Sequence, residues 1–337
     1  MAHSRNFIRT RECQTPIETV FAARTHPPIV EILVLGAGAI GSFFGGVLSR
    51  RHDVVLIGRT EHVAAIRSHG LRISGKTALI AKPRAATRIP QNAKPELVLV
   101  TTKAYDTANA MLAVRPFADR AIFLTLQNGL GNAETIAKTA RRVVAGTTAH
   151  GVTFEGPGEV RHAGVGETVL GGWARVHEAD LVRLRDIFAD VGIAARVTSD
   201  IRSELWSKLV VNASINPIAA LAGVPNGRLV RDRRLQEVLG DVCREAAAVA
   251  KAEGARVDSD ELYKRTVLIA KRTAANRASM LQDLERRRRT EIEAITGAIV
   301  RAADRHLIPV PLNRMLFALV RAREGAVHGG TDANQAD

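Results

Sequence analysis

The sequence predicts an α/β domain built on a parallel sheet, followed by an all-helical domain. Up to about residue 199, short apolar runs of strand length alternate with helical segments, which is typical of a parallel sheet covered by helices. Beyond Thr198-Ser199-Asp200, a helix N-cap signal, only helical periodicity remains. We therefore expect a sheet domain over residues 30–199 and a helical domain over residues 200–325.

The first predicted strand, Ile32–Leu35, runs directly into Gly36-Ala-Gly-Ala-Ile-Gly41. A buried strand that turns into a helix through GxGxxG is typical of a Rossmann-like dinucleotide-binding unit. Gly36 would permit the tight turn, Gly38 the close approach of a pyrophosphate, and Gly41 the packing of helix on strand. The helix start would hold the phosphates. Alone, the pattern is equally compatible with a glycine-rich turn that binds no ligand.

The second strand of this unit, Asp53–Ile57, carries the signal for the choice of cofactor. A fold of this type that prefers NAD usually places Asp or Glu after this strand, where it accepts a hydrogen bond from the ribose 2′-OH. Here Gly58 and Arg59 follow instead. An arginine offers a fork to a 2′-phosphate, so NADP is favoured over NAD. The alternative is that Arg59 is an ordinary surface cation.

Two further polar residues follow predicted strands. Lys103 comes after a strand over residues 96–102 and is expected to point toward the crevice where such sheets bind ligands. Asn128 comes after a strand over residues 121–126, where its amide could face a nicotinamide. The other strands expected in this domain are an edge hairpin (71–73 and 77–81), 143–147, and an antiparallel pair (159–162 and 168–170) that completes the sheet.

The first helix of the second domain carries Lys208, Asn212 and Asn216 at intervals of four residues, so all three lie along one stripe. Its other positions are largely apolar, which predicts a buried helix. Burying these polar groups is costly unless they line a polar cleft, and Pro217 is expected to break the helix beside that cavity. A stripe that simply faces solvent is the alternative. The expected helices of this domain are 200–222, 232–253, 258–273, 280–306 and 312–324.

The composition narrows the function classes. Of the residues, 46% are hydrophobic, as in globular proteins, and no stretch is long and apolar enough to span a membrane. The net charge of +14 could attract nucleic acid, but only 4% of residues are aromatic and the arginines are scattered. We therefore expect no nucleic-acid or membrane partner. Even the run Arg286–Arg289 is interpreted as a solvated helix surface.

The cysteines and histidines suggest no metal site. Cys13 and Cys243 lie far apart and form no CxxC pair, which suits a reducing cytoplasm. His150 and His162 have no partner at metal-ligand spacing, so we interpret them as structural or solvent-exposed. Residues 1–29 are expected to form a flexible extension and residues 326–337 a disordered tail.

Several motifs in fixed order resemble the ketopantoate reductase family over residues 31 to 324. They are GAGAIG, TTKAYD, LQNGLG, ELWSKLVVNASINP, VPNGRL, SMLQDLERRRRTEIEAITGAIV and IPVPLN. The resemblance implies a Rossmann-like domain joined to a helical domain, with the active site in the cleft between them. It also implies reduction of a 2-keto acid with NADPH on the route to pantothenate and coenzyme A. The sequence departs from the family at Thr296, where asparagine is frequent.

The resemblance also assigns roles to residues. Lys208 would be the general acid that donates a proton to the ketone oxygen, and Glu291 would hold the substrate's hydroxyl group. The substrate-binding positions are Asn212, Asn216, Asn226 and Ser279. The cofactor-binding positions are Gly36, Ala37, Gly38, Ala39, Ile40, Gly41, Arg59, Lys103 and Asn128.

Two alternatives stay open from the sequence. A relative of the same fold could reduce a different 2-keto acid, because these residues grip only the shared keto-acid group. A non-catalytic NADP-binding sensor, or a nucleic-acid binder that uses the positive charge, is disfavoured by the intact Lys-Asn-Asn stripe. The sequence also leaves open whether the helical domain forms a homodimer.

Overall fold

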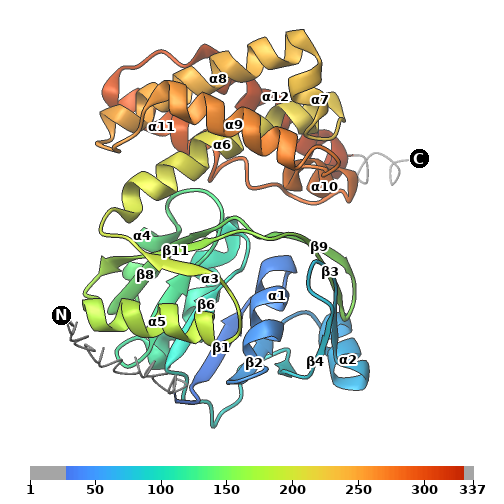
Figure 1. The fold of residues 1–337 in the computed structure, drawn as a ribbon, viewed down its shortest axis with the longest axis vertical. Helices are drawn as coiled ribbons and strands as arrows, with labels where there is room; N and C mark the ends of the chain where they lie inside the picture. The colour runs from blue at the N-terminus through green and yellow to red at the C-terminus, as the bar shows by residue number, and fades with distance from the viewer. Residues whose placement is uncertain (1–27, 330–337) are drawn as a thin grey trace, which may run out of the picture.

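The computed structural model describes residues 28–329 and confirms the predicted fold class. The sheet domain and the helical domain are stacked along the long axis of the molecule (Figure 1). Most of the expected N-terminal extension, 1–29, lies outside the described residues, as do residues 330–337. The last helix, α12 (Pro311–Gly329), continues into the segment 326–337 that was expected to be disordered.

The main sheet has eight strands in the order β12-β11-β8-β7-β6-β1-β2-β5. The strands from β8 to β5 are all parallel, whereas β11 runs antiparallel to β8. Their carboxyl ends therefore share one edge, which faces the helical domain (Figure 1). The strands are β1 (Glu31–Leu35), β2 (Asp53–Ile57), β5 (Arg84–Ala86), β6 (Leu97–Val100), β7 (Ile122–Thr125), β8 (Arg142–Thr148), β11 (Thr168–Ala174) and β12 (Ala195–Val197).

The apolar runs are strands because both faces of this sheet are covered. Ile32 and Val34 of β1 belong to the buried cluster on one face, and Leu33 and Leu35 belong to the cluster on the other. Alternating side chains of a strand point to opposite faces, so a strand buried on both sides must be apolar throughout. The helices of this domain are α1 (Ala39–Leu48), α2 (Thr60–His69), α3 (Thr107–Ala113), α4 (Asn132–Ala137) and α5 (Glu178–Asp190), with short 3₁₀ turns η1 (Ala104–Asp106) and η2 (Arg115–Phe117).

A second, four-stranded sheet corrects one prediction. The strand expected at 159–162 does not complete the main sheet but pairs with β3 and β9 beside α1. Val160 and His162 of this strand are buried while Glu159 and Arg161 are exposed, the alternation of a strand covered on one face only. The expected hairpin 71–73 and 77–81 lies in the same sheet. Its order is β4 (Leu79–Ala81), β3 (Leu71–Gly75), β10 (Glu159–Gly164) and β9 (Gly151–Gly156).

In the helical domain α6 is the central helix. It packs against α8, α9, α10 and α12 and also contacts β8 and β11 of the sheet domain. It begins at a capped turn, in which the Asp200 carboxylate accepts a hydrogen bond from the Ser203 N–H at 3.1 Å. The helices are α6 (Ile201–Ala222), α7 (Arg228–Arg231), α8 (Arg233–Ala252), α9 (Ser259–Arg272), α10 (Ser279–Glu285), α11 (Thr296–His306) and α12.

Two helix predictions were wrong. Pro217 does not break α6, which continues to Ala222 and ends at Gly223 with a φ of +68°. The single helix expected over 280–306 is two helices, α10 and α11, joined by an irregular segment. Four successive arginines follow α10, where their mutual repulsion disfavours another helical turn, and the second of them, Arg287, has a φ of +52°. The run Arg286–Arg289 is therefore a connecting segment and not a helix surface.

Candidate active site

The glycine turn at the end of β1 is shaped by close backbone contacts. Gly36 has a φ of +106°, and a Cβ there would lie 2.7 Å from the Thr102 nitrogen. A Cβ at Gly41 would lie 2.1 Å from the Gly36 oxygen. Both positions therefore require glycine for the fold itself. A Cβ at Gly38 would meet no atom within 4 Å, so this glycine leaves open space and no neighbour explains it.

That open space lies at the start of α1. Gly38 is the N-cap residue, and no side chain caps the helix, so its first N–H groups stay available to an anion. The turn is held from both sides: the Ala37 N–H donates to the Ile57 oxygen at 2.8 Å, and Thr101 Oγ1 donates to the Gly36 oxygen at 2.8 Å. The residues present thus fit a dinucleotide pyrophosphate.

Arg59 lies where the sequence predicted, directly after β2. It is the N-cap residue of α2, and its side chain is exposed. Within residues 28–329 its guanidinium has no ion pair with a carboxylate. An unpaired cation at the end of the second strand is available to a phosphate on the adenosine ribose.

Lys103 links the two domains. Its Nζ lies 2.7 Å from Asp283 Oδ2 on α10 and 3.5 Å from Glu291 Oε2, while the Ala104 N–H donates to Glu291 Oε1 at 3.2 Å. Burial opposes the charge on Lys103, but these two carboxylates outweigh it and raise the pKa of the ammonium. Burial raises the pKa of the Asp283 carboxyl, and the Lys103 ammonium offsets that rise only in part. The prediction that Lys103 points into the crevice missed Asp283, which the motif SMLQD contains.

Lys208 lies on α6, and its ammonium interacts electrostatically with the Glu291 carboxylate. Burial lowers the pKa of Lys208 to about 8, and the Glu291 carboxylate acts in the opposite direction. Glu291 itself is 8% exposed. The structure therefore brings together Lys208, Glu291 and Lys103, which the sequence places far apart. Because Glu291 is not helical, the sequence argument that set it against Glu293 on two helix faces does not apply. Glu293 instead pairs with Arg301 and Arg321.

Asn128 lies in a loop that touches the helical domain close to Glu291. Its backbone oxygen accepts a hydrogen bond from Asn132 Nδ2 at 3.0 Å, and the following loop continues to Leu130, whose N–H donates to the Ala294 oxygen at 2.9 Å. The neighbouring Gln127 is part of the motif LQNGLG, but the sequence alone suggested no role for it. It is buried, and its Nε2 donates to the Thr102 oxygen and to Thr107 Oγ1, both at 2.7 Å. Gln127 thereby fixes the ends of β6 and β7 relative to each other.

The predicted substrate-binding residues differ from one another in burial and in hydrogen bonding. Asn212 and Asn216 follow Lys208 along α6, Asn212 half-buried and Asn216 buried. Asn226 is buried; its Nδ2 donates to Thr273 Oγ1 at 2.9 Å, whereas its Oδ1 has no hydrogen-bond partner among the described residues. An unpartnered buried acceptor is unusual and suits a hydroxyl ligand. Ser279 is exposed and opens α10, one turn before Asp283.

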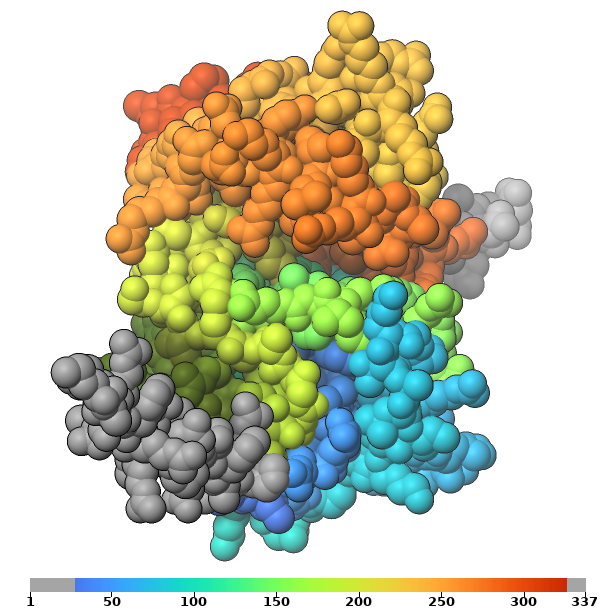
Figure 2. Space-filling model, viewed as in Figure 1, coloured from blue at the N-terminus to red at the C-terminus, as the bar shows by residue number. Residues whose placement is uncertain are grey.

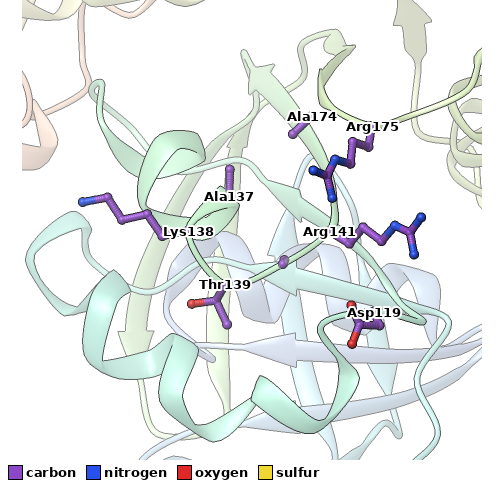
Figure 3. Close-up of a pocket in the computed structure, with 8 residues that line it drawn as sticks. Asp119, Ala137, Lys138, Thr139, Arg141, Ala174 and Arg175 are labelled. Carbon is purple, nitrogen blue, oxygen red and sulfur yellow. The ribbon is translucent and has the colours of Figure 1, made fainter.

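The surface is hollowed along the line where the helical domain meets the sheet domain (Figure 2). A different hollow, of about 490 Å³, lies at the amino end of β8, opposite the edge that carries Lys103 (Figure 3). It contains none of the predicted site residues, and in Figure 3 Arg175 reaches toward its centre while Lys138 points away. Its lining is Asp119, Ala137, Lys138, Thr139, Ala140, Arg141, Ala174 and Arg175.

The two histidines left open by the sequence are buried and not solvent-exposed. His150 Nδ1 and His162 Nε2 lie 3.0 Å apart, and both rings pack on Phe43. Burial lowers the pKa of both imidazoles, that of His150 to about 4, and so disfavours charge on either ring. In the described part of the chain, no cluster of three or more His, Cys, Asp or Glu is arranged for a metal ion. None of the helices between residues 28 and 329 is sufficiently long and apolar to span a membrane.

Comparisons with known proteins agree with this geometry. The family described as "Ketopantoate reductase PanE/ApbA" matches residues 32–175, and the one described as "Ketopantoate reductase PanE/ApbA C terminal" matches residues 200–324. A curated 2-dehydropantoate 2-reductase of Halobacterium salinarum is 41% identical over 87% of this chain and 98% of its own length. One of Pyrococcus horikoshii is 37% identical over 90% of this chain and 100% of its own length.

Solved structures show the same similarity. A PanE/ApbA family ketopantoate reductase from Ralstonia eutropha has a TM-score of 0.81 at 37% identity, covering 88% of this chain and 99% of that one. A ternary structure of D-mandelate dehydrogenase with NADH and anilino(oxo)acetate has a TM-score of 0.84 at 27% identity, with the same shares covered. The two family matches together, and each of these curated relatives alone, cover most of the chain and both domains. The chain belongs to the ketopantoate reductase family.

Proposed function

We propose that this protein reduces 2-dehydropantoate to (R)-pantoate with NADPH, on the route to pantothenate and coenzyme A. The observation that carries the proposal is the approach of Lys208 and Lys103 to one buried carboxylate, Glu291, where the two domains meet. Two cations and an acid beside the glycine turn match what the reduction of a negatively charged keto acid requires. The identity of 41% with a curated 2-dehydropantoate 2-reductase supports this substrate.

The cofactor is proposed to lie along the edge where the parallel strands end. Residues Gly36 to Gly41 would hold its pyrophosphate, and Lys103 and Asn128 would border its nicotinamide half. Arg59 would pair with a 2′-phosphate, which makes NADPH the expected cofactor over NADH. The bound cofactor supplies the hydride that is added to the substrate's carbonyl carbon.

Lys208 is proposed to supply the proton. Its ammonium would donate a hydrogen bond to the ketone oxygen and stabilise the negative charge that develops there as hydride arrives at carbon. Proton transfer from Nζ to that oxygen then completes the alcohol and leaves a neutral lysine, which takes a proton from solvent. A pKa of about 8 keeps most of the lysine protonated at neutral pH yet makes it a better acid than an ordinary lysine.

Glu291 is proposed to hold the substrate's hydroxyl group and to keep Lys208 charged. Asn212, Asn216, Asn226 and Ser279 would complete the substrate contacts, with the unpartnered Asn226 Oδ1 accepting a hydrogen bond. A cytoplasmic location and a homodimeric state of the protein both stay predictions.

A substrate screen with NADPH and NADH side by side tests the proposal. We expect oxidation of NADPH on addition of 2-dehydropantoate, with pantoate as the product, and a clear loss of rate when NADH replaces NADPH. No turnover of 2-dehydropantoate with either cofactor would refute it.

A second candidate is the reduction of another 2-keto acid. The similarity to D-mandelate dehydrogenase, at a TM-score of 0.84, favours it specifically, because that structure of the same fold holds anilino(oxo)acetate, an oxo acid with an aryl group. Comparing kcat/KM for 2-dehydropantoate with that for an aryl 2-keto acid such as benzoylformate separates the two. A non-catalytic NADP sensor or a nucleic-acid binder would show no turnover and, for the latter, steeply salt-dependent DNA binding.

A further inference from the structure

The arginine run Arg286–Arg289 has no role in the proposed reaction, yet it lies at the boundary of the two domains. It connects α10, which carries Asp283, to Glu291. All four side chains are exposed. Four adjacent like charges repel one another, so an anion bound among them would relieve that repulsion.

The run is attached to the sheet domain at both of its ends. Arg286 Nη2 donates to the Phe154 oxygen of β9 at 3.1 Å. The guanidinium carbon of Arg289 lies 4.5 Å from the centre of the Tyr105 ring, and the Tyr105 hydroxyl donates to the Arg289 oxygen at 3.4 Å. The two middle arginines are therefore held between two points of the sheet domain.

Those two points flank the glycine turn. The Phe154 ring lies 4.9 Å from the ring of His62 on α2, and His62 Nε2 is 2.9 Å from Ser42 Oγ on α1, so the first attachment lies beside α1 and α2. Tyr105 follows β6, the neighbour of β1 on the other side. Because β1 lies between β6 and β2, the run spans the region where β1 ends and α1 begins.

The guanidinium groups of the two middle arginines, Arg287 and Arg288, have no hydrogen-bonded or ion-paired partner among residues 28–329. Arg288 lies close enough to Asp283 to favour its ionised form, but that carboxylate already binds Lys103. Arg287 has a left-handed φ of +52°, which is unfavourable for arginine and is retained where the surroundings impose it.

We propose that Arg287 and Arg288 bind phosphate groups of the dinucleotide held at the glycine turn, so that the helical domain helps to close the cofactor site. The inference rests on the proposed cofactor, but it assigns a second set of cations that comes from the other domain. It predicts that cofactor affinity depends on contacts across the domain boundary and not on the sheet domain alone.

The test compares the double variant Arg287→Gln/Arg288→Gln with a matched control, Arg265→Gln/Arg272→Gln, which removes two exposed arginines from α9. The dissociation constants for NADPH and NADH are measured by titration calorimetry on the full chain. We expect NADPH to bind about tenfold or more weakly to the first variant, as for the loss of a charged hydrogen bond of about 1.4 kcal/mol or more, and within twofold of wild type to the control. An Arg287→Lys/Arg288→Lys variant should retain most of the affinity.

A loss shared by NADH assigns the contact to the pyrophosphate, whereas a loss for NADPH alone assigns it to the 2′-phosphate. NADPH affinity within twofold of wild type in the first variant overturns the inference while leaving the proposed function intact. Wild-type protein that binds neither dinucleotide overturns both. An equal loss in the control variant also overturns the inference, because it would reflect net charge alone. Unchanged thermal unfolding confirms that the variants are folded.

Discussion

The Lys103 ammonium lies 2.7 Å from the Asp283 carboxylate, and this contact joins the end of β6 to α10. It is a partly buried ion pair between residues that are 180 positions apart. The same ammonium lies 3.5 Å from Glu291, so one cation sets the position of a candidate catalytic residue relative to the sheet domain. Removing the Asp283 carboxylate would leave this partly buried ammonium with Glu291 as its remaining partner.

Replacing Asp283 by asparagine should therefore disturb the substrate site more than the fold. Lys103 would then pair with Glu291 alone and draw it away from Lys208. We expect KM for the keto acid to rise about three- to tenfold with a smaller change in kcat, measured by NADPH oxidation. Asp241→Asn, which alters an exposed pair on α8, is the control. Equal KM values in the Asp283 variant and wild type would show that the contact does not position the site.

Lys208→Ala should lower kcat by about 10²- to 10⁴-fold, the usual contribution of a general acid. The wild-type rate should be full below pH 8 and should fall as the pH rises through about 8, because the acid is then lost. The Lys208→Arg variant should keep the charge but not the titration, so its rate should stay flat through this range. A wild-type pH profile with no decline between pH 7 and pH 9 would contradict the assignment.

Substituting Gly38 and Gly41 by alanine, one at a time, should distinguish an effect on cofactor binding from an effect on folding. Gly38→Ala places its Cβ in open space, so the variant should unfold at the wild-type temperature but bind NADPH far more weakly. Gly41→Ala drives its Cβ into the Gly36 carbonyl, so it should lower the unfolding free energy by about 1–3 kcal/mol or more. Thermal unfolding and NADPH titration of both variants check the pair. Unimpaired NADPH binding by Gly38→Ala would show that no pyrophosphate lies there.

Arg59→Ser should change the choice of cofactor. Loss of a charged hydrogen bond of about 1.5–3 kcal/mol raises KM for NADPH roughly 10- to 100-fold, while KM for NADH should stay within twofold. Steady-state kinetics with both cofactors measure the ratio, and Arg67→Ser on the same helix serves as a control for α2. If both KM values rise alike, Arg59 does not contact the 2′-phosphate.

Much of the sheet domain could be predicted because its strands are apolar throughout and end at turn residues. The strand Ile32–Leu35 and the glycine turn have the same bounds in sequence and structure within one residue. The wrong predictions concern elements whose structure is determined by contacts between residues far apart in the sequence. Pro217 stays in α6 because the surrounding bundle holds the helix, and β10 joins the small sheet because α1 covers one of its faces.

The site could be predicted only in part, for the same reason. Lys208, Asn212 and Asn216 share one helix, so their spacing alone places them together. The pairing of Lys103 with Asp283 and Glu291 joins segments that no local pattern relates. Gln127 was overlooked because a buried amide that serves only other protein groups leaves no periodic signal.

The low pKa of Lys208 makes a prediction about stability that is independent of turnover. Its pKa in the folded state, about 8, lies below its unfolded value of 10.5, so between these values the unfolded chain binds more protons than the folded one. Folding stability contributed by this group therefore rises with pH through that window, and at pH 7 the charged lysine costs free energy. Lys208→Met should remove this cost and raise the unfolding free energy at pH 7 by about 1–3 kcal/mol. Chemical denaturation at pH 7 and pH 10 measures it, and the gain should shrink at pH 10. A Lys208→Met variant less stable than wild type at pH 7 would show that the ammonium is compensated in the folded protein.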